Sequence, residues 1–91
     1  MNVVDLNADV GESYGLMHSG IDSEIIPHVS SVNIATGFHS GDPDTIKKTV
    51  ELALSYSKSI GAHPSYPDLQ GFGRRKIDMD IDSIENLISY L

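Results

Sequence analysis

Residues 31–43, SVNIATGFHSGDP, constrain the fold of this chain more than any other stretch. The apolar run at residues 32–35 is short and bounded by turn residues, which is typical of a strand buried on both faces. Gly37 and Gly41 then accept backbone angles that other residues resist, so the chain can turn sharply around His39. The stretch therefore predicts a buried strand followed by a tight turn that carries a histidine.

A helix is expected directly after this turn. Asp42 is a good helix cap, and Pro43 suits the first helical turn. His39 is thus predicted to lie between the end of a strand and the start of a helix. Parallel α/β proteins bind their ligands at such positions.

The remaining chain alternates in the same way. Further strands are expected at residues 2–10 and 59–63, and residues 64–75 contain too many prolines and glycines for a regular element. The expected helices cover residues 22–26 with Asp22 as the cap, residues 43–58, and a last segment that starts at Asp82 with a box-like cap formed by residues 82–85. The apolar faces of the last two helices are Ile46, Val50, Ala53, Leu54 and Ser57 in one, and Ile84, Leu87, Ile88 and Leu91 in the other.

This order predicts an α/β fold with three parallel strands and right-handed crossover helices. Residues 1–91 are expected to form one domain that stops before a fourth strand, as the N-terminal part of a larger (β/α) barrel. Three strands leave both sheet edges open, so self-association through these edges is expected.

Composition excludes several kinds of function. The chain has 6 Lys and Arg against 13 Asp and Glu, a formal net charge of -7, which disfavours nucleic acid and anionic membranes as partners. It has no cysteine, so thiolate chemistry and disulfides are excluded. Neither a signal peptide nor an apolar run long enough to cross a membrane is visible. A cytoplasmic location is therefore expected.

Polar side chains follow each predicted strand. Asn7, Asp9 and Glu12 belong to the end of the first strand, His39 follows the second, and His63 ends the third. Two imidazoles and one or two carboxylates at one edge of a sheet can bind a divalent metal. Without a metal, the same groups can act as general acid and base. A purely structural role also stays open, with hydrogen-bonded histidines, Asp9 shaping the turn and Glu12 in solvent.

Two other features are less specific. The run at residues 71–75, GFGRR, places Arg74 and Arg75 in a loop where they can bind a carboxylate or phosphate, or remain solvated in a turn. His18 and His28 are expected on the surface.

Three longer motifs identify a resemblance. Residues 5–15 (DLNADVGESYG), 33–43 (NIATGFHSGDP) and 60–75 (IGAHPSYPDLQGFGRR) resemble, in order and spacing, the motifs of the LamB/YcsF family. The resemblance covers essentially the whole chain. Thr36 stands where the family usually has cysteine, and a later family motif, Lys-Pro-His-Gly, is not in this sequence.

The resemblance implies a barrel of the glycoside hydrolase/deacetylase type and a 5-oxoprolinase activity. In that reaction 5-oxo-L-proline is opened to L-glutamate with ATP as co-substrate, by a complex with two further subunits, B and C. Related proteins hold a divalent metal with Asp and His at strand ends. The positions that match are Asp9, His39 and His63, which are the expected catalytic and metal-binding residues.

The expected substrate-binding residues are Asn7, Glu12, Arg74 and Arg75, with an arginine holding the substrate carboxylate. Two rival functions remain open. One is a metal-dependent hydrolase or deacetylase that acts without ATP. The other is a truncated, non-catalytic piece that serves in assembly.

Overall fold

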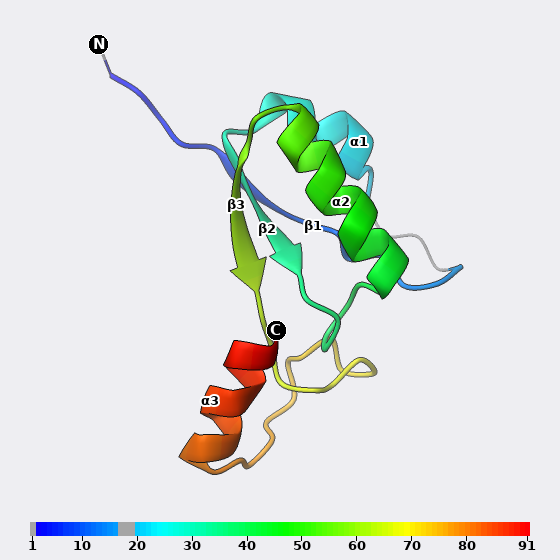
Figure 1. Cartoon of the computed structure of the whole chain (residues 1–91), viewed down its shortest axis with the longest axis vertical. Helices are drawn as coiled ribbons and strands as arrows, with labels where there is room; N and C mark the ends of the chain where they lie inside the picture. The colour runs from blue at the N-terminus through cyan, green and yellow to red at the C-terminus, as the bar shows by residue number, and fades with distance from the viewer. Residues whose placement is uncertain (1, 17–19) are drawn as a thin grey trace.

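A computed structural model describes residues 2–16 and 20–91 (Figure 1). His18 lies outside the described residues, and His28 is exposed, as predicted. The elements in chain order are β1 (Asn7–Val10), α1 (Asp22–Ile25), the 3-10 helix η1 (Ile26–His28), β2 (Ser31–Ala35), α2 (Pro43–Ser55), β3 (Ser59–His63) and α3 (Ile81–Tyr90). The strands form one parallel sheet in the order β1-β2-β3, which confirms the predicted α/β class with three parallel strands.

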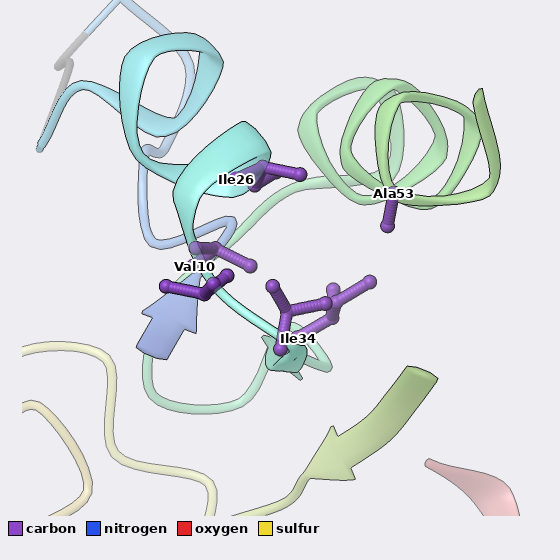
Figure 2. Close-up of a cluster of buried hydrophobic side chains, with 6 residues drawn as sticks. Val10, Ile26, Ile34 and Ala53 are labelled. Carbon is purple, nitrogen blue, oxygen red and sulfur yellow. The ribbon is translucent and has the colours of Figure 1, made fainter. Parts of the chain in front are cut away.

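The hydrophobic core lies between one face of the sheet and the helices that cover it. Figure 1 shows α1 and α2 on the same side of the strands. Figure 2 shows side chains from β1, η1, β2 and α2 pointing toward one another in this space: Val10, Ile26, Ile34 and Ala53. Each of them is 3% exposed or less. Packing of this kind fixes the strands, and therefore their ends, relative to one another.

The other face of the sheet is polar. The prediction that β2 is buried on both faces is therefore wrong. Buried residues alternate with half-buried ones along most of the strand, because both covering helices lie on one side. On the polar face, the Asn33 side-chain amide donates to Asn7 Oδ1 over 2.9 Å, and Asn7 Nδ2 donates to Ser31 Oγ over 2.8 Å. A hydrogen-bonded row of side chains therefore crosses β1 and β2.

β1 is shorter than expected. It begins at Asn7 rather than residue 2, and Val3 is 85% exposed. The pairing partner of Asn7 is Ser31, the first residue of β2, so β2 offers no ladder partner to the preceding residues. Leu6 still accepts a backbone hydrogen bond from Ser30 over 2.7 Å. Apolar alternation alone therefore overestimated the strand.

The predicted cap of α2 is correct, and those of the other two helices are wrong. Asp42 accepts a hydrogen bond from the Thr45 N–H over 3.0 Å. Asp22 lies inside α1, and its carboxylate instead accepts from the Gly11 N–H over 2.8 Å. Tertiary contact with the end of β1 thus replaces the local cap.

α3 begins at Ile81 rather than Asp82, because Asp80 is its N-cap and accepts from the Ser83 N–H over 2.7 Å. α2 ends at Ser55, before residue 58, and Ser57 then takes a left-handed φ of 56°. Leu54, assigned to the apolar face of α2, is 62% exposed. Among the described residues, none of the helices combines the length and apolar character needed to cross a membrane.

Candidate active site

Three side chains meet beyond the carboxyl ends of the strands. Glu12 follows β1, His39 lies in the turn after β2, and His63 is the last residue of β3. One potential ligand atom from each of the three lies within 4.8 Å of the others. The parallel sheet therefore brings together residues that are up to 51 positions apart in the sequence, 63 minus 12.

Tight backbone packing places His39 beside Glu12. Gly41 has a φ of 85°, and a Cβ added there would lie 2.8 Å from the Gly11 carbonyl oxygen. The Ser40 hydroxyl donates a hydrogen bond to the Glu12 carbonyl. The turn after β2 is thereby joined directly to the segment after β1.

His39 is buried without polar partners. It is 3% exposed, and neither ring nitrogen has a hydrogen-bond partner among the described residues. Its ring centroid lies 4.6 Å from that of His63. Burial, followed by the charges of His63 and Arg74, lowers the pKa of His39 below 6.5 and favours the neutral imidazole. Neutral imidazole is the form that accepts a proton or binds a metal.

Glu12 contributes the carboxylate of this group. Burial raises the pKa of Glu12 above 4.5, and the nearby charge of Asp9 acts in the same direction. Such a carboxyl group holds a proton at higher pH than usual, which suits proton transfer.

Asp9 lies beside the group rather than in it. Its Oδ1 is 3.6 Å from His63 Nδ1, and the Asn33 side chain donates to the same oxygen over 3.4 Å. At 3.6 Å the two atoms are too far apart for a hydrogen bond, and His63 Nδ1 has no hydrogen-bond partner among the described residues, so Asp9 only places a carboxylate beside His63. The structure thus groups Glu12 with the two histidines, where the sequence suggested Asp9 first.

Asn7 is not brought into the group. It precedes Asp9 by two residues on β1, which is about 7 Å along a strand. Its side chain is engaged by Ser31 and Asn33. Thr36, at the end of β2, donates from its hydroxyl to the His63 carbonyl over 3.3 Å and so joins the ends of β2 and β3.

The two arginines have different environments. Arg75 donates from Nε to Asp68 Oδ1 over 2.9 Å, and the Asp68 side chain is 1% exposed. The hydrogen bonds from Arg75 and from the Gly71 N–H lower the pKa of Asp68 to about 2. Arg75 therefore fixes the loop, and Arg74 lines a cavity. The spacing of Asp68 and Gly71 fits the turn in which the Gly71 N–H donates to Asp68 Oδ1 over 2.9 Å, but no pattern in the sequence indicates Arg75 as the partner of Asp68.

A cavity of about 360 Å³ adjoins the histidines. His39 and His63 contribute to its lining, and Arg74 is its cationic group. Three side chains of α3 form an apolar wall: Ile84, Leu87 and Ile88. Three of the four residues of the apolar stripe predicted for α3 thus face this cavity. Sequence reasoning also missed Phe72, which lines the cavity beside Arg74.

The fold and the site define a class: a parallel α/β protein with a histidine and carboxylate group at its strand ends, next to a cavity that holds one arginine. The family model described as the LamB/YcsF family matches residues 4–91, and the chain belongs to that family.

Known proteins resemble this chain over nearly its whole length. The A subunit of a 5-oxoprolinase from Bacillus cereus (strain ATCC 10987 / NRS 248) is 49% identical over 90 residues, covering 99% of this chain and 36% of that protein. The A subunit of a 5-oxoprolinase from Bacillus mycoides (strain KBAB4) is also 49% identical, with 35% of its length covered. The chain thus spans just over a third of the curated relatives it matches.

A solved structure supports the fold. The crystal structure of a lactam utilization protein from Thermus thermophilus superposes with a TM-score of 0.90 at 49% sequence identity. The match covers 96% of this chain and 35% of that chain.

Proposed function

We propose that this chain carries part of the active site of a lactam-opening enzyme, acting as the A subunit of a 5-oxoprolinase. The names of its relatives support this activity. The observation that carries the proposal is the Glu12, His39 and His63 group beside a cavity with a single arginine. The substrate would be 5-oxo-L-proline, a small ring with one carboxylate.

Each group has a role in this proposal. Arg74 holds the substrate carboxylate, since a guanidinium fork matches a carboxylate. The lactam carbonyl then lies toward His39 and His63. Neutral His39 accepts a proton from the attacking water, and Glu12, with its raised pKa, donates one to the leaving nitrogen. Asp9 places a second carboxylate 3.6 Å from His63 Nδ1, where it would stabilise a positive charge that develops on this ring.

Opening the lactam requires free energy, which ATP hydrolysis can supply. An unstrained five-membered lactam is a stable amide, so opening it requires an added driving force. Transfer of the γ-phosphoryl group of ATP to the amide oxygen would release ADP and give a better electrophile. One water would then attack the amide carbon and the C–N bond would break, which leaves an acyl phosphate, and a second water would hydrolyse this to L-glutamate and phosphate. We propose that subunits B and C join this chain in the complex that performs these steps.

A divalent metal also fits the site. The buried ring nitrogens of His39 lack partners among the described residues, and the ligand atoms of Glu12, His39 and His63 lie within 4.8 Å of one another. Imidazole and carboxylate suit Zn²⁺ and similar ions. A bound ion would supply Lewis-acid polarisation of the lactam carbonyl.

The same group supports a second candidate function, a metal-dependent hydrolase or deacetylase that needs no ATP. This function predicts stoichiometric metal and turnover by the chain alone. The lactam-opening proposal predicts that product forms only when ATP and subunits B and C are present.

The proposal also concerns the complete fold to which these three strands belong. We propose that β1, β2 and β3 are the first strands of a (β/α) barrel of the glycoside hydrolase/deacetylase type. The parallel order of the strands and the greater length of the relatives support this. The polar row of Asn7, Asn33 and Asp9 would then face the barrel interior.

Reconstitution tests the activity. The chain is combined with subunits B and C, and glutamate release from 5-oxo-L-proline is measured with and without ATP. We expect His39→Ala and His63→Ala to lower the rate by about 10²-fold or more, the usual contribution of general acid-base catalysis. His28→Ala, at an exposed histidine, is the matched control. Near-normal turnover by both active-site variants would refute the assigned roles.

A further inference from the structure

Phe72 has an unusual backbone conformation. Its φ is 56°, in the left-handed region that bulky residues rarely adopt, and it lies between Gly71 and Gly73. Phe72 is 40% exposed, so burial in a core does not account for the strain. Strained residues persist where the surroundings determine them, and they gather at functional sites.

Asp68 holds the strained turn in place. The Gly71 N–H donates to Asp68 Oδ1 over 2.9 Å, and the Gly73 N–H donates to the Asp68 carbonyl over 2.8 Å. The Asp68 N–H in turn donates to the Phe38 carbonyl over 3.0 Å. The turn is therefore fixed to the residue that precedes His39.

The Phe72 ring contacts two groups of the site. Its centroid lies 5.1 Å from that of His39, with the rings at 81° to each other. The Arg74 guanidinium carbon lies 5.9 Å from the same centroid, a cation-π distance. A Cβ on Gly73 would lie 2.8 Å from His39 Cβ, so backbone packs on this histidine as well.

His39 depends on such packing for its orientation. Neither of its ring nitrogens has a hydrogen-bond partner among the described residues, and its two ring neighbours are His63 and Phe72. We propose that Phe72 is a positioning residue, which sets both the imidazole plane of His39 and the guanidinium of Arg74 from one strained turn. The inference rests on the proposed function for what the two groups then bind.

Substitutions at position 72 separate positioning from stability. Phe72→Gly removes the ring and also relieves the left-handed strain, because glycine accepts positive φ freely. We expect its melting temperature to equal or exceed that of the wild type. Its affinities for Co²⁺, followed by visible absorption, and for 5-oxo-L-proline, followed by calorimetry, should each fall about tenfold, as when other supports of metal ligands are lost.

Two further variants sharpen the comparison. Phe72→Tyr keeps the ring and should restore both affinities. Leu69→Ala is the matched control, since Leu69 is 46% exposed in the same loop and is not part of the cavity lining. Unchanged affinities in Phe72→Gly would overturn the proposal, and so would a loss of affinity that merely follows a loss of melting temperature.

A metal-free measurement keeps this inference distinct from the proposed function. If the wild-type chain binds neither Co²⁺ nor 5-oxo-L-proline, the proposed function fails. The His39 ring signals in the NMR spectrum still report its orientation. One sharp set in the wild type that broadens or doubles in Phe72→Gly supports positioning by Phe72, and identical line shapes in both would overturn it.

Discussion

At the scale of single residues, Gly61 shows how tightly the polar face of the sheet is built. A Cβ at this position would lie 2.8 Å from Asn33 Oδ1, and Asn33 donates to Asp9. Rotation of the Asn33 side chain away from the new methyl group would break its hydrogen bonds, so we expect Gly61→Ala to cost about 0.5–1.5 kcal/mol of unfolding free energy. Urea denaturation of the purified chain measures this cost.

A double-mutant cycle identifies the cause. Asn33→Ala removes the oxygen that the new methyl group would meet, so Gly61→Ala should cost less in that background. We expect a coupling of at least about 0.5 kcal/mol, the lower range for residues in contact. Strict additivity of the two changes would contradict the proposed clash.

The sequence correctly predicted the site residues whose location follows from the end of a strand. His63 ends its strand and His39 follows the preceding one, as the alternation predicted. The prediction failed where a loop folds back on itself. The Asp68 and Arg75 pair and the left-handed Phe72 depend on tertiary contacts in residues 64–75, which no periodic pattern describes.

At the scale of elements, the contact between η1 and the sheet should carry much of the stability. Ile26 is fully buried, and Figure 2 shows it in the same buried cluster as Val10 and Ile34. We expect Ile26→Ala to cost about 2–5 kcal/mol, since truncation leaves a cavity. Ile81→Ala is the matched control, because Ile81 is 80% exposed. A cost above about 0.5 kcal/mol there would contradict the assigned exposure.

α3 is attached differently, beyond the carboxyl end of β3 and apart from α1 and α2 (Figure 1). None of its residues is buried, and Tyr90 stacks on Phe38 with ring centroids 5.8 Å apart. Tyr90→Ala should remove about 0.5–1.5 kcal/mol of aromatic contact. We expect faster hydrogen exchange at the amides of α3 and unchanged exchange in β2. Equal acceleration in both elements would show that α3 does not open separately.

Patterns in the sequence predicted where the helices and strands lie. They predicted less well where each element begins and what its side chains contact. β3 matches its predicted range, and Asp42 caps α2 as predicted. The caps of α1 and α3 were wrong because Asp22 has a tertiary partner and Asp80 competes with Asp82. The apolar stripe of α3 was seen correctly, but its spacing could not distinguish a core from a cavity wall.

At the scale of the whole molecule, the open sheet edges favour self-association, whereas the net charge opposes it. β1 and β3 are the outer strands of the sheet, which leaves backbone groups free to pair with a second copy. The formal charge of -7 repels such a copy, and salt screens this repulsion. We expect association, measured by sedimentation, to rise between about 0.1 M and about 1 M salt as the Debye length falls from about 10 Å to about 3 Å. Ile60→Glu adds a negative charge to β3 and should reduce the association. Salt-independent sedimentation would contradict this prediction.

Acid stability depends on two carboxylates in different parts of the molecule. Hydrogen bonds from Arg75 and Gly71 lower the pKa of Asp68 to about 2, and those from Thr45 and Gly15 lower the pKa of Asp42 to about 2, from an ordinary 3.8. Between pH 3.8 and about pH 2 the unfolded chain binds more protons than the folded chain, so the free energy of unfolding decreases as the pH is lowered. This contribution is complete above about pH 4 and is lost as the pH approaches 2.

Urea unfolding at a series of pH values from 5 to about 2 tests this dependence for Asp68. Asp68→Asn should be less stable than the wild type at pH 5, because Arg75 loses its charged partner, and its stability should fall less steeply toward low pH. Asp78→Asn is the control, since the Asp78 side chain is 94% exposed. If Asp68→Asn kept the wild-type slope, the Arg75 pair would not be the source of the acid dependence, and the loop that carries Phe72 would need another anchor.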